Sequence, residues 1–416
     1  MHATVAPGAL RSSGGDMARP LLTDGMREQA AAAARNLLHY CRSRNWTGID
    51  PYDALNSRLF AGGFLLNGRP ARLAFTQLLK RSPVNLRPLF RIPETQNPKA
   101  LALFLAATVQ YPKLAGDHES AAIVRQLKDR IQALRSPGMS YWCWGYSFPW
   151  QTRTILVPAA APNLVCTTFV ANALLDVHER HGDTDCLEMG LSAAEYLLRD
   201  LFRTEGPSVA GFAYPLPSAS IHTHNANFLA AALLGRAYKR TGSAEFRDAA
   251  LKAARYSANC QRPDGSWAYG EARRQQWIDN FHTGYNLCAL KQLGRDLETD
   301  EFRDCVSRGF DFYWNHFFRE NGAVCYYADR PYPIDSHCVA QSLITFMQFA
   351  HERPDVLKIV PLVFAWTMQH LWDSRGFFYY RVHRIGTVKT SYMRWCQAWM
   401  LLALTTMLSH SEAGVN

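Results

Sequence analysis

Three features of the sequence predict an all-α fold, an (α/α)6 toroid built from six helical hairpins. An aromatic cluster with a leading glycine recurs at Gly211, Gly265, Gly322 and Gly376, at steps of 54, 57 and 54 residues. An amphipathic helical pattern precedes each cluster, and a mostly apolar helical pattern with a polar start follows it. No long apolar–polar alternation of the β type competes with these patterns. A regular period of this length is typical of stacked supersecondary units.

The mostly apolar patterns predict inner helices, which are buried on several sides. They are expected to start near Pro98, Asn163, His222, Asp279, Asp335 and Ser391, the last five being 56 to 59 residues apart. The amphipathic patterns predict outer helices from Asp185, Ser243, Thr299 and Arg353. An open solenoid would need polar outer faces on its end repeats, and the sequence shows none. The six hairpins, with a repeat of about 56 residues, are therefore expected to close into a ring.

The N-terminal third fits the repeat less closely. A helix is expected over residues 31–46. Residues 70–82 and 98–112 are expected to form a further outer and inner pair, followed by an outer helix over 119–134. Residues 1–24 are predicted to be a disordered segment, and residues 25–412 a single toroid domain.

The composition indicates a globular protein with a large core, because 48% of the residues are hydrophobic and 19% are charged. The net charge of +10 favours an anionic partner, such as nucleic acid, acidic lipid head groups or an acidic sugar. No finger spacing, RNP motif or run of basic residues occurs, so no nucleic-acid partner is expected. The positive charges are scattered, and a solvated surface with a mild bias explains them equally well.

The ten cysteines contain no CxxC pair, which favours buried thiols in a reducing compartment over a disulfide frame. The first 25 residues hold no hydrophobic run typical of a signal peptide. No apolar stretch reaches the roughly 18 residues that a membrane span needs. The expected location is therefore the cytoplasm, and no cofactor is predicted.

If the ring closes, all six inner helices run the same way and their N-termini meet at one end. Unpaired N–H groups and positive dipole ends make such a basin suited to negative charge. Asp279, His282, Asp335 and His337 lie at these helix starts and are the predicted catalytic residues. Asp279 and Asp335 are also good N-caps, and any single histidine could be a core imidazole. Because three consecutive repeats carry a histidine there, we expect capping and a site together.

Aromatic loops are expected to line the same mouth, where their faces can stack on sugar rings and arginines can pair with carboxylates. The predicted substrate-binding residues lie in these loops or at the helix starts: Trp142, Trp144, Asn163, Tyr214, His222, His224, Asn225, Trp267, Tyr269, Asn280, Tyr327, Tyr380 and Arg394. His222 and His224 are also candidate metal ligands. No further carboxylate spacing supports a metal, so none is predicted.

Several segments resemble a known family. "GIDPYDALNS" from Gly48, "RSPVNLRPLF" from Arg81, "NPKALALFLAA" from Asn97 and "WIDNFHTGYNL" from Trp277 are similar to VpsJ-type bacterial polysaccharide biosynthesis proteins. The resemblance covers nearly all of residues 27–410, within the six-hairpin glycosidase-like superfamily of hydrolases, lyases and sugar epimerases. It implies a role in making or tailoring an extracellular or capsular polysaccharide, and it supplies no established catalytic residues.

A second resemblance competes with the first. "NCQRPDGSWAYG" from Asn259 is similar to the QW repeat of terpene cyclases and protein prenyltransferases, which are also α/α toroids. The acidic DxDD and aspartate-rich motifs that the cyclases need are absent from the sequence. We therefore interpret this segment as structural: Gly265 permits a tight turn and Trp267 packs between helices.

Three functions stay open at this point. The first is an enzyme acting on an anionic, uronate-type saccharide, either a hydrolase with Asp279 and Asp335 as acid and base, or a lyase or epimerase. In the latter, His282 or His337 would move a proton next to the carboxylate, and a tyrosine (Tyr214, Tyr269 or Tyr327) could be the opposing acid. The second is a non-catalytic protein that holds an acidic oligosaccharide, polysaccharide or lipid-linked sugar, peripheral to a membrane assembly complex. The third is isoprenoid chemistry.

Overall fold

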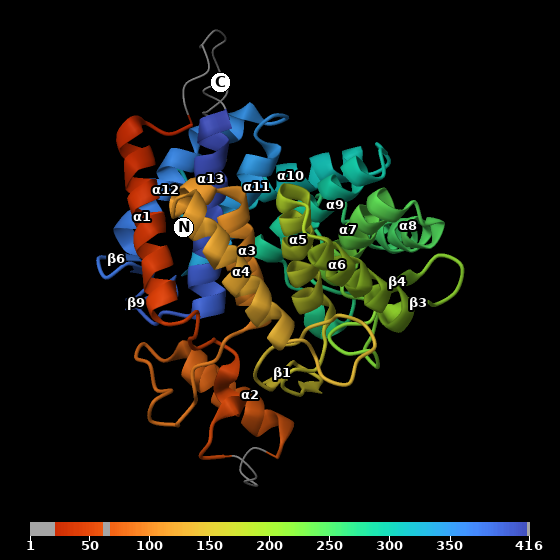
Figure 1. The fold of residues 1–416 in the computed structure, drawn as a ribbon, viewed down its shortest axis with the longest axis horizontal. Helices are drawn as coiled ribbons and strands as arrows, with labels where there is room; N and C mark the ends of the chain where they lie inside the picture. The colour runs from red at the N-terminus through yellow and green to blue at the C-terminus, as the bar shows by residue number, and fades with distance from the viewer. Residues whose placement is uncertain (1–20, 61–66, 414–416) are drawn as a thin grey trace.

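Six inner helices form a closed ring within the part of the chain that this computed structural model describes, residues 21–60 and 67–413. They are α3 (Pro98–Gln110), α5 (Leu164–His181), α7 (His224–Thr241), α9 (Asn280–Asp296), α11 (Ser336–Phe349) and α13 (Trp399–Ala413). Each contacts the next along the chain, and α13 contacts α3 (Figure 1). The predicted (α/α)6 toroid is confirmed.

The outer helices pack against the ring. Five of them follow their inner helix in the chain: α4 (Asp117–Ala133), α6 (Thr184–Tyr196), α8 (Ala244–Asn259), α10 (Arg303–Phe317) and α12 (Val360–His370). The outer partner of α13 is α1 (Asp24–Ser43), from the opposite end of the chain (Figure 1). The two ends of the chain therefore close the toroid together.

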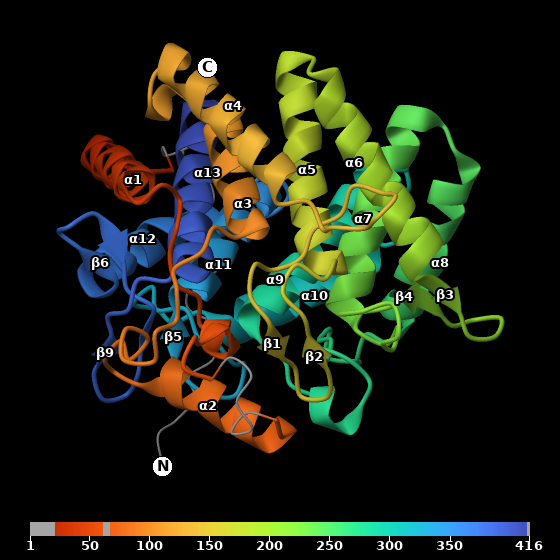
Figure 2. The same cartoon turned by 60° about the horizontal axis from the view of Figure 1, so that its bottom comes forward.

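The expectation for residues 70–82 is wrong in one respect. These residues form a helix, α2 (Arg69–Arg81), but its main contacts are with the short helix η1 (Asp53–Asn56) and strand β1 (Trp150–Gln151). Figure 2 shows α2 beyond the ends of the inner helices, near β1. It covers one end of the toroid and is not an outer helix.

The segment predicted to be disordered comprises residues 1–24, of which residues 1–20 lie outside the described part of the chain. Its last four residues are described, and Leu21 and Leu22 are buried in the main core. Helix α1 begins at Asp24, capped by the side chain of Thr23. The structured chain thus starts a few residues earlier than predicted.

Side-chain caps explain why most inner helices begin where they do. Asn97, Asn163, Asp279 and Asp335 each accept a hydrogen bond from a backbone N–H of the following turn. Helix α7 begins after Thr223, one residue later than predicted. The π-helix η7 (Met393–Ala398) leads directly into α13. The last inner helical segment therefore starts at Met393, two residues later than the expected Ser391.

Short antiparallel strand pairs occupy the loops at the ends of the helices. They are β1 with β2 (Leu156–Val157), β3 (Phe202–Thr204) with β4 (Ala210–Phe212), β6 (Trp372–Asp373) with β7 (Phe377–Phe378), and the sheet β5 (Ile334–Asp335), β8 (Arg381–Val382) and β9 (Thr387–Val388). The register of β5 and β8 sets Asp335 opposite Arg381. The remaining short helices are η3 (Pro112–Leu114), η4 (Leu197–Leu201), η5 (Arg273–Gln275) and η6 (Pro354–Lys358).

One hydrophobic cluster runs around the ring from Leu21 to Leu408. Trp267 belongs to it and donates its indole N–H to the carbonyl of Ser257 at 3.1 Å. Gly265 has φ +88°, and a Cβ there would lie 2.3 Å from the carbonyl oxygen of Arg308. The structural interpretation of this turn is therefore confirmed. No helix of the described residues is both long and apolar enough to cross a membrane.

Candidate active site

The first turns of several inner helices meet at one end of the ring, as predicted. The ring of His337, at the start of α11, lies 4.5 Å from Phe281 of α9 and 4.6 Å from Trp395 of η7. Lys99, at the start of α3, lies with Nζ 3.9 Å from the ring centre of Phe169 in α5. Five side chains from five elements of the ring thus come together at this end.

Asp279 and His282 form the best-positioned pair in this region. One carboxylate oxygen of Asp279 accepts the backbone N–H of His282 at 3.0 Å and thereby caps α9. The other lies 2.7 Å from His282 Nδ1 and accepts the indole N–H of Trp277 at 2.9 Å. When Nδ1–H donates to the carboxylate, the imidazole keeps its Nε2 lone pair free, since no described residue hydrogen-bonds to Nε2. This is the arrangement of a general base.

The walls around His282 are aromatic. Tyr269 and Tyr285 present their rings at 4.7 and 5.9 Å from the imidazole, and Tyr269 stacks on Trp277 at 4.4 Å. The side chain of His282 is 20% exposed, whereas that of Asp279 is 1% exposed. The imidazole is therefore the accessible member of the pair, and the buried carboxylate orients it.

Asp335 does not have the geometry of a catalytic acid or base. Its side chain is fully buried and accepts four hydrogen bonds. Arg381 donates to Oδ2 at 2.6 and 3.2 Å. The indole of Trp395 and the backbone N–H of His337 both donate to Oδ1 at 2.9 Å. With all its acceptor positions in use, this carboxylate is a structural group, and the predicted catalytic role is not supported.

His337 lies between Phe281 and Trp399, each with its ring centre 4.5 Å away. Its Nε2 is 2.6 Å from the hydroxyl of Tyr285. Burial, together with the nearby charges of Lys99 and Arg394, lowers the pKa of His337 well below its ordinary value. The imidazole is therefore neutral near pH 7 and can accept the phenolic proton in a hydrogen bond.

Two buried cations lie beside these rings. Arg394 donates to both carboxylate oxygens of Asp50 at 2.7 and 2.8 Å, so its charge is already paired. Lys99 is 3% exposed, and within the described part of the chain its Nζ makes no hydrogen bond. It lies 5.2 and 5.5 Å from the ring centres of Trp399 and Tyr285. Burial and the charge of Arg394 lower the pKa of Lys99 well below that of a free lysine.

Helix α2 and the β1–β2 hairpin cover the site, where an open basin was expected. Lys80 of α2 donates to the hydroxyl of Tyr52 at 2.6 Å and lies 5.6 Å from the ring centre of Trp395. Burial and the charge of Arg381 lower the pKa of Lys80 to about 7. The β1–β2 hairpin adjoins α2 and reaches the loop before α9, where Arg153 lies 4.1 Å from the ring centre of Trp277.

The predicted substrate-binding residues divide into groups. Tyr269 and Tyr327 are half-buried near the pair of Asp279 and His282, and Tyr214 is half-buried near Tyr269. Trp144, Trp267 and Tyr380 are fully buried and pack in the core. Asn163 caps α5, Asn225 is buried in the first turn of α7, and Asn280 accepts from Tyr313 and Ser342 on the outer side of α9.

Three further predicted residues face the outer layer. The guanidinium of Arg135 lies over Trp142, 4.5 Å from the centre of the indole ring. The backbone N–H of Trp142 donates to the hydroxyl of Ser192 in α6. His222 and His224 lie against Tyr256 of α8. The expectation that three histidines face one basin is therefore wrong for His224, because its ring turns toward the outer helix.

Several residues that the structure brings to the site were not predicted from the sequence: Tyr52, Lys80, Lys99, Tyr285 and Trp395. Lys99 carried a signal, because it is a lone cation in the first turn of an apolar helix, where the helix dipole disfavours positive charge. Tyr285 lies three residues after His282 and so shares its helix face. The others come from distant segments of the chain and carry no local signal.

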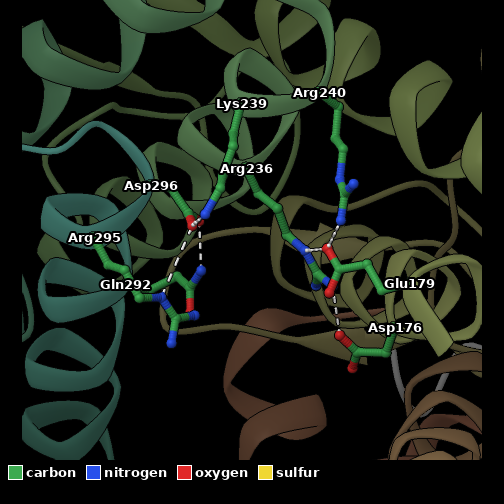
Figure 3. A pocket seen from close by; sticks show the side chains of 8 residues that line it. All are labelled: Asp176, Glu179, Arg236, Lys239, Arg240, Gln292, Arg295 and Asp296. Carbon is green, nitrogen blue, oxygen red and sulfur yellow. Dashed lines mark hydrogen bonds and ion pairs between the residues drawn. The ribbon is translucent and has the colours of Figure 1, made fainter.

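Two surface cavities lie away from these residues. One, of about 300 Å³, lies at the C-terminal ends of α5, α7 and α9. Figure 3 shows that its lining is a network of ion pairs, with Arg236 donating to Asp176 at 2.6 Å. Cations at helix C-termini complement the dipole. The other, of about 240 Å³, lies between the end of α1 and residues 389–393. Neither contains the predicted catalytic residues.

Acid is expected to destabilise the protein through His337. Its folded pKa is depressed, so the unfolded chain binds a proton below about pH 6.5 that the folded chain does not bind. The contribution of the neutral His337 to the free energy of unfolding is complete above that pH. It is lost as the pH falls, by up to about 1.4 kcal/mol per pH unit. His337→Phe keeps the stacked ring and removes the titration. Urea unfolding between pH 5 and 7.5 should show that the free energy of unfolding depends less on pH in this variant than in wild type. His351→Asn, a change at an exposed histidine, should show the same pH dependence as wild type.

No protein-family model matches the chain, and no curated protein matches it. Solved structures share its fold. An unsaturated glucuronyl hydrolase specific for heparin is similar with a TM-score of 0.64 at 12% identity, over 95% of this chain and 99% of the other. A family 76 glycoside hydrolase (mannosidase) from Bacteroides thetaiotaomicron has a TM-score of 0.63 at 13% identity, over 94% of this chain and 100% of the other. A cellobiose 2-epimerase from Spirochaeta thermophila has a TM-score of 0.58 at 14% identity, over 77% of this chain and 87% of the other. At these identities the likeness shows the fold alone: the chain is an (α/α)6 toroid.

Proposed function

We propose that this protein is an enzyme that acts on a saccharide by moving a proton at a carbon next to a carbonyl or carboxylate group, as an epimerase or a lyase does. The observation that carries the proposal is the Asp279–His282 pair, with its carboxylate 2.7 Å from Nδ1 and its Nε2 free among tyrosines. Solved toroids of this fold include an epimerase and a glucuronyl hydrolase, which supports a saccharide as the substrate.

The geometry favours this chemistry over hydrolysis by two carboxylates. A glycosidase needs one carboxyl group to protonate the leaving oxygen and another to activate water or attack the sugar. Asp335 is saturated by four donors, and Asp279 is committed to the cap, Trp277 and His282. Neither has a free oxygen to present to a sugar, whereas His282 has a free nitrogen.

The proposed step begins with Nε2 of His282 accepting the proton from carbon. The electron pair of the broken C–H bond moves into the adjacent C–O group, and the resulting negative charge is stabilised by the helix N-termini and by Lys99, whose protonated form that charge favours. Return of a proton to the opposite face inverts the carbon. Departure of the substituent on the next carbon, with a proton from a tyrosine, gives an unsaturated product instead. Tyr269, which is half-buried with its ring 4.7 Å from that of His282, is the candidate donor.

We further propose that the substrate is anionic, of the uronate type, and belongs to an extracellular or capsular polysaccharide. Support comes from the unpaired Lys99, from the net charge of +10 and from the resemblance to VpsJ-type proteins. In a strain that makes such a polymer, deletion of the gene is expected to change its uronate content. Wild-type protein should restore it, and the His282→Ala variant should not.

The reaction class is tested by incubating the full-length protein with uronate-containing and neutral oligosaccharides and following mass and NMR spectra. Epimerisation keeps the mass and inverts one carbon, whereas elimination yields an unsaturated product. Products that gain one water without either change would overturn the proposal in favour of hydrolysis. Binding without any chemical change would overturn it in favour of a non-catalytic saccharide-binding protein.

A further inference from the structure

A second group of reactive side chains lies outside the candidate active site, between the start of α7 and the end of α8. His224 is the first residue of α7, Cys260 caps the C-terminus of α8, and Glu271 lies in the loop that follows. The ligand atoms of these three side chains all lie within 4.8 Å of one another. Among the described residues no other His, Cys, Asp and Glu side chains form such a group.

We infer that His224, Cys260 and Glu271 bind a divalent metal ion, and that zinc is the ion they fit best. Thiolate, imidazole and carboxylate are the three protein ligands of zinc. A thiolate in the set disfavours magnesium and calcium, which take oxygen ligands only. The site is independent of the proposed function, since none of its ligands belongs to the proposed proton-transfer machinery.

Neighbouring hydrogen bonds hold the ligands in place. His224 Nδ1 lies 3.3 Å from the hydroxyl of Ser257, which accepts from the side chain of Asn227 at 3.0 Å. Tyr256 donates its hydroxyl to the carboxylate of Glu271 at 2.5 Å. Metal ligands in proteins are commonly oriented by such outer contacts, and both Ser257 and Tyr256 belong to the rigid helix α8.

A tetrahedral zinc site needs a fourth ligand, and the neighbouring His222 would supply it by turning toward the other three. Its Nδ1 lies 3.6 Å from the Glu271 carboxylate, and its other ring nitrogen lies 3.2 Å from Glu205. To reach the ion, this side chain, which is 30% exposed, has to release the hydrogen bond between its Nδ1 and the hydroxyl of Tyr256. With one thiolate and one carboxylate, the four ligands neutralise the charge of a divalent ion.

The ion would tie the loop after α8 to the start of α7. The backbone already joins them, since His224 N–H donates to the carbonyl of Tyr269 at 3.1 Å and Glu271 N–H to that of His222 at 3.2 Å. Tyr269 is also a wall of the candidate active site, at 4.7 Å from His282. The metal is therefore structural, and it fastens a loop that reaches the proposed base.

The test is made on the full-length protein, stripped with a chelator and titrated with Co²⁺ and then Zn²⁺ under a non-thiol reductant. Wild type is expected to bind one equivalent of Co²⁺ with a near-ultraviolet thiolate-to-cobalt band that Zn²⁺ abolishes. Cys260→Ser should lose the band and weaken zinc binding by at least roughly tenfold. Cys288→Ser is the matched control, because Cys288 is likewise free and partly buried, and it should behave as wild type.

A wild-type protein without the band, or an equal effect of the two serine substitutions, would overturn the inference. Glu271→Gln provides a second variant that keeps the shape of the side chain and all ten cysteines. It should weaken zinc binding by at least roughly tenfold while circular dichroism stays unchanged. Unchanged zinc affinity in this variant would also overturn the site.

Discussion

His282→Ala is expected to lower kcat on the saccharide substrate by about 100- to 10,000-fold, the usual contribution of a positioned general base. The free Nε2 of His282 is the accessible basic atom beside Asp279, and alanine removes it. KM should change much less, because the aromatic walls remain. The measurement is steady-state kinetics on the substrate identified by mass and NMR. Activity within a few-fold of wild type would exclude His282 as the base.

Asp279→Asn separates catalysis from helix capping. Asparagine is as good an N-cap as aspartate, so α9 should keep its start, and the free energy of unfolding should fall only by about 1–3 kcal/mol, because the amide nitrogen cannot accept the hydrogen bond from Trp277. The neutral amide cannot stabilise the imidazolium of His282, so kcat should still fall by at least about 100-fold. If activity stays near the wild-type level, Asp279 serves as a cap alone.

The second large effect is expected on stability, at the buried ion pair of Asp50 and Arg394. Both residues are 3% exposed, and the guanidinium donates to both carboxylate oxygens. Asp50→Leu leaves a buried, unpaired cation and should lower the free energy of unfolding by about 3–5 kcal/mol. The pair matters for the toroid because it fastens residue 50, near the start of the chain, to the element that precedes α13. Urea unfolding at neutral pH measures the change.

The matched control is the double variant Asp50→Leu with Arg394→Met. It removes both charges, so most of the stability lost in the single variant should return. Additive losses in the double variant, or a loss below about 1 kcal/mol in Asp50→Leu, would show that the pair contributes little to the closure of the ring.

The inner helices could be predicted from the sequence because their starts depend on local chemistry. A capping residue such as Asn163, Asp279 or Asp335 acts on backbone groups two or three positions away. The role of α2 could not be predicted, since its amphipathic pattern is the same whether it packs outside the ring or across its end. The pairing of α1 with α13 depends on closure of the whole ring, which no local pattern specifies.

The candidate site divides in the same way. The Asp279–His282 pair was predictable because the two residues are three apart at one helix start. The saturation of Asp335 was not, since its partners Arg381 and Trp395 reach it through a strand register and a neighbouring helix. Of the proposed metal ligands, His224 was a candidate from the sequence, but Cys260 and Glu271 were not, because they lie 36 and 47 residues further along the chain and only the fold brings them to it.

The most direct test of the proton-transfer mechanism is the incubation of substrate with the full-length protein in D₂O. The account predicts that the hydrogen on the carbon next to the carbonyl or carboxylate group is lost: NMR should show deuterium in its place after epimerisation, or a double bond at that carbon after elimination, and neither change with His282→Ala. Turnover by wild type that leaves the original hydrogen on that carbon would contradict it.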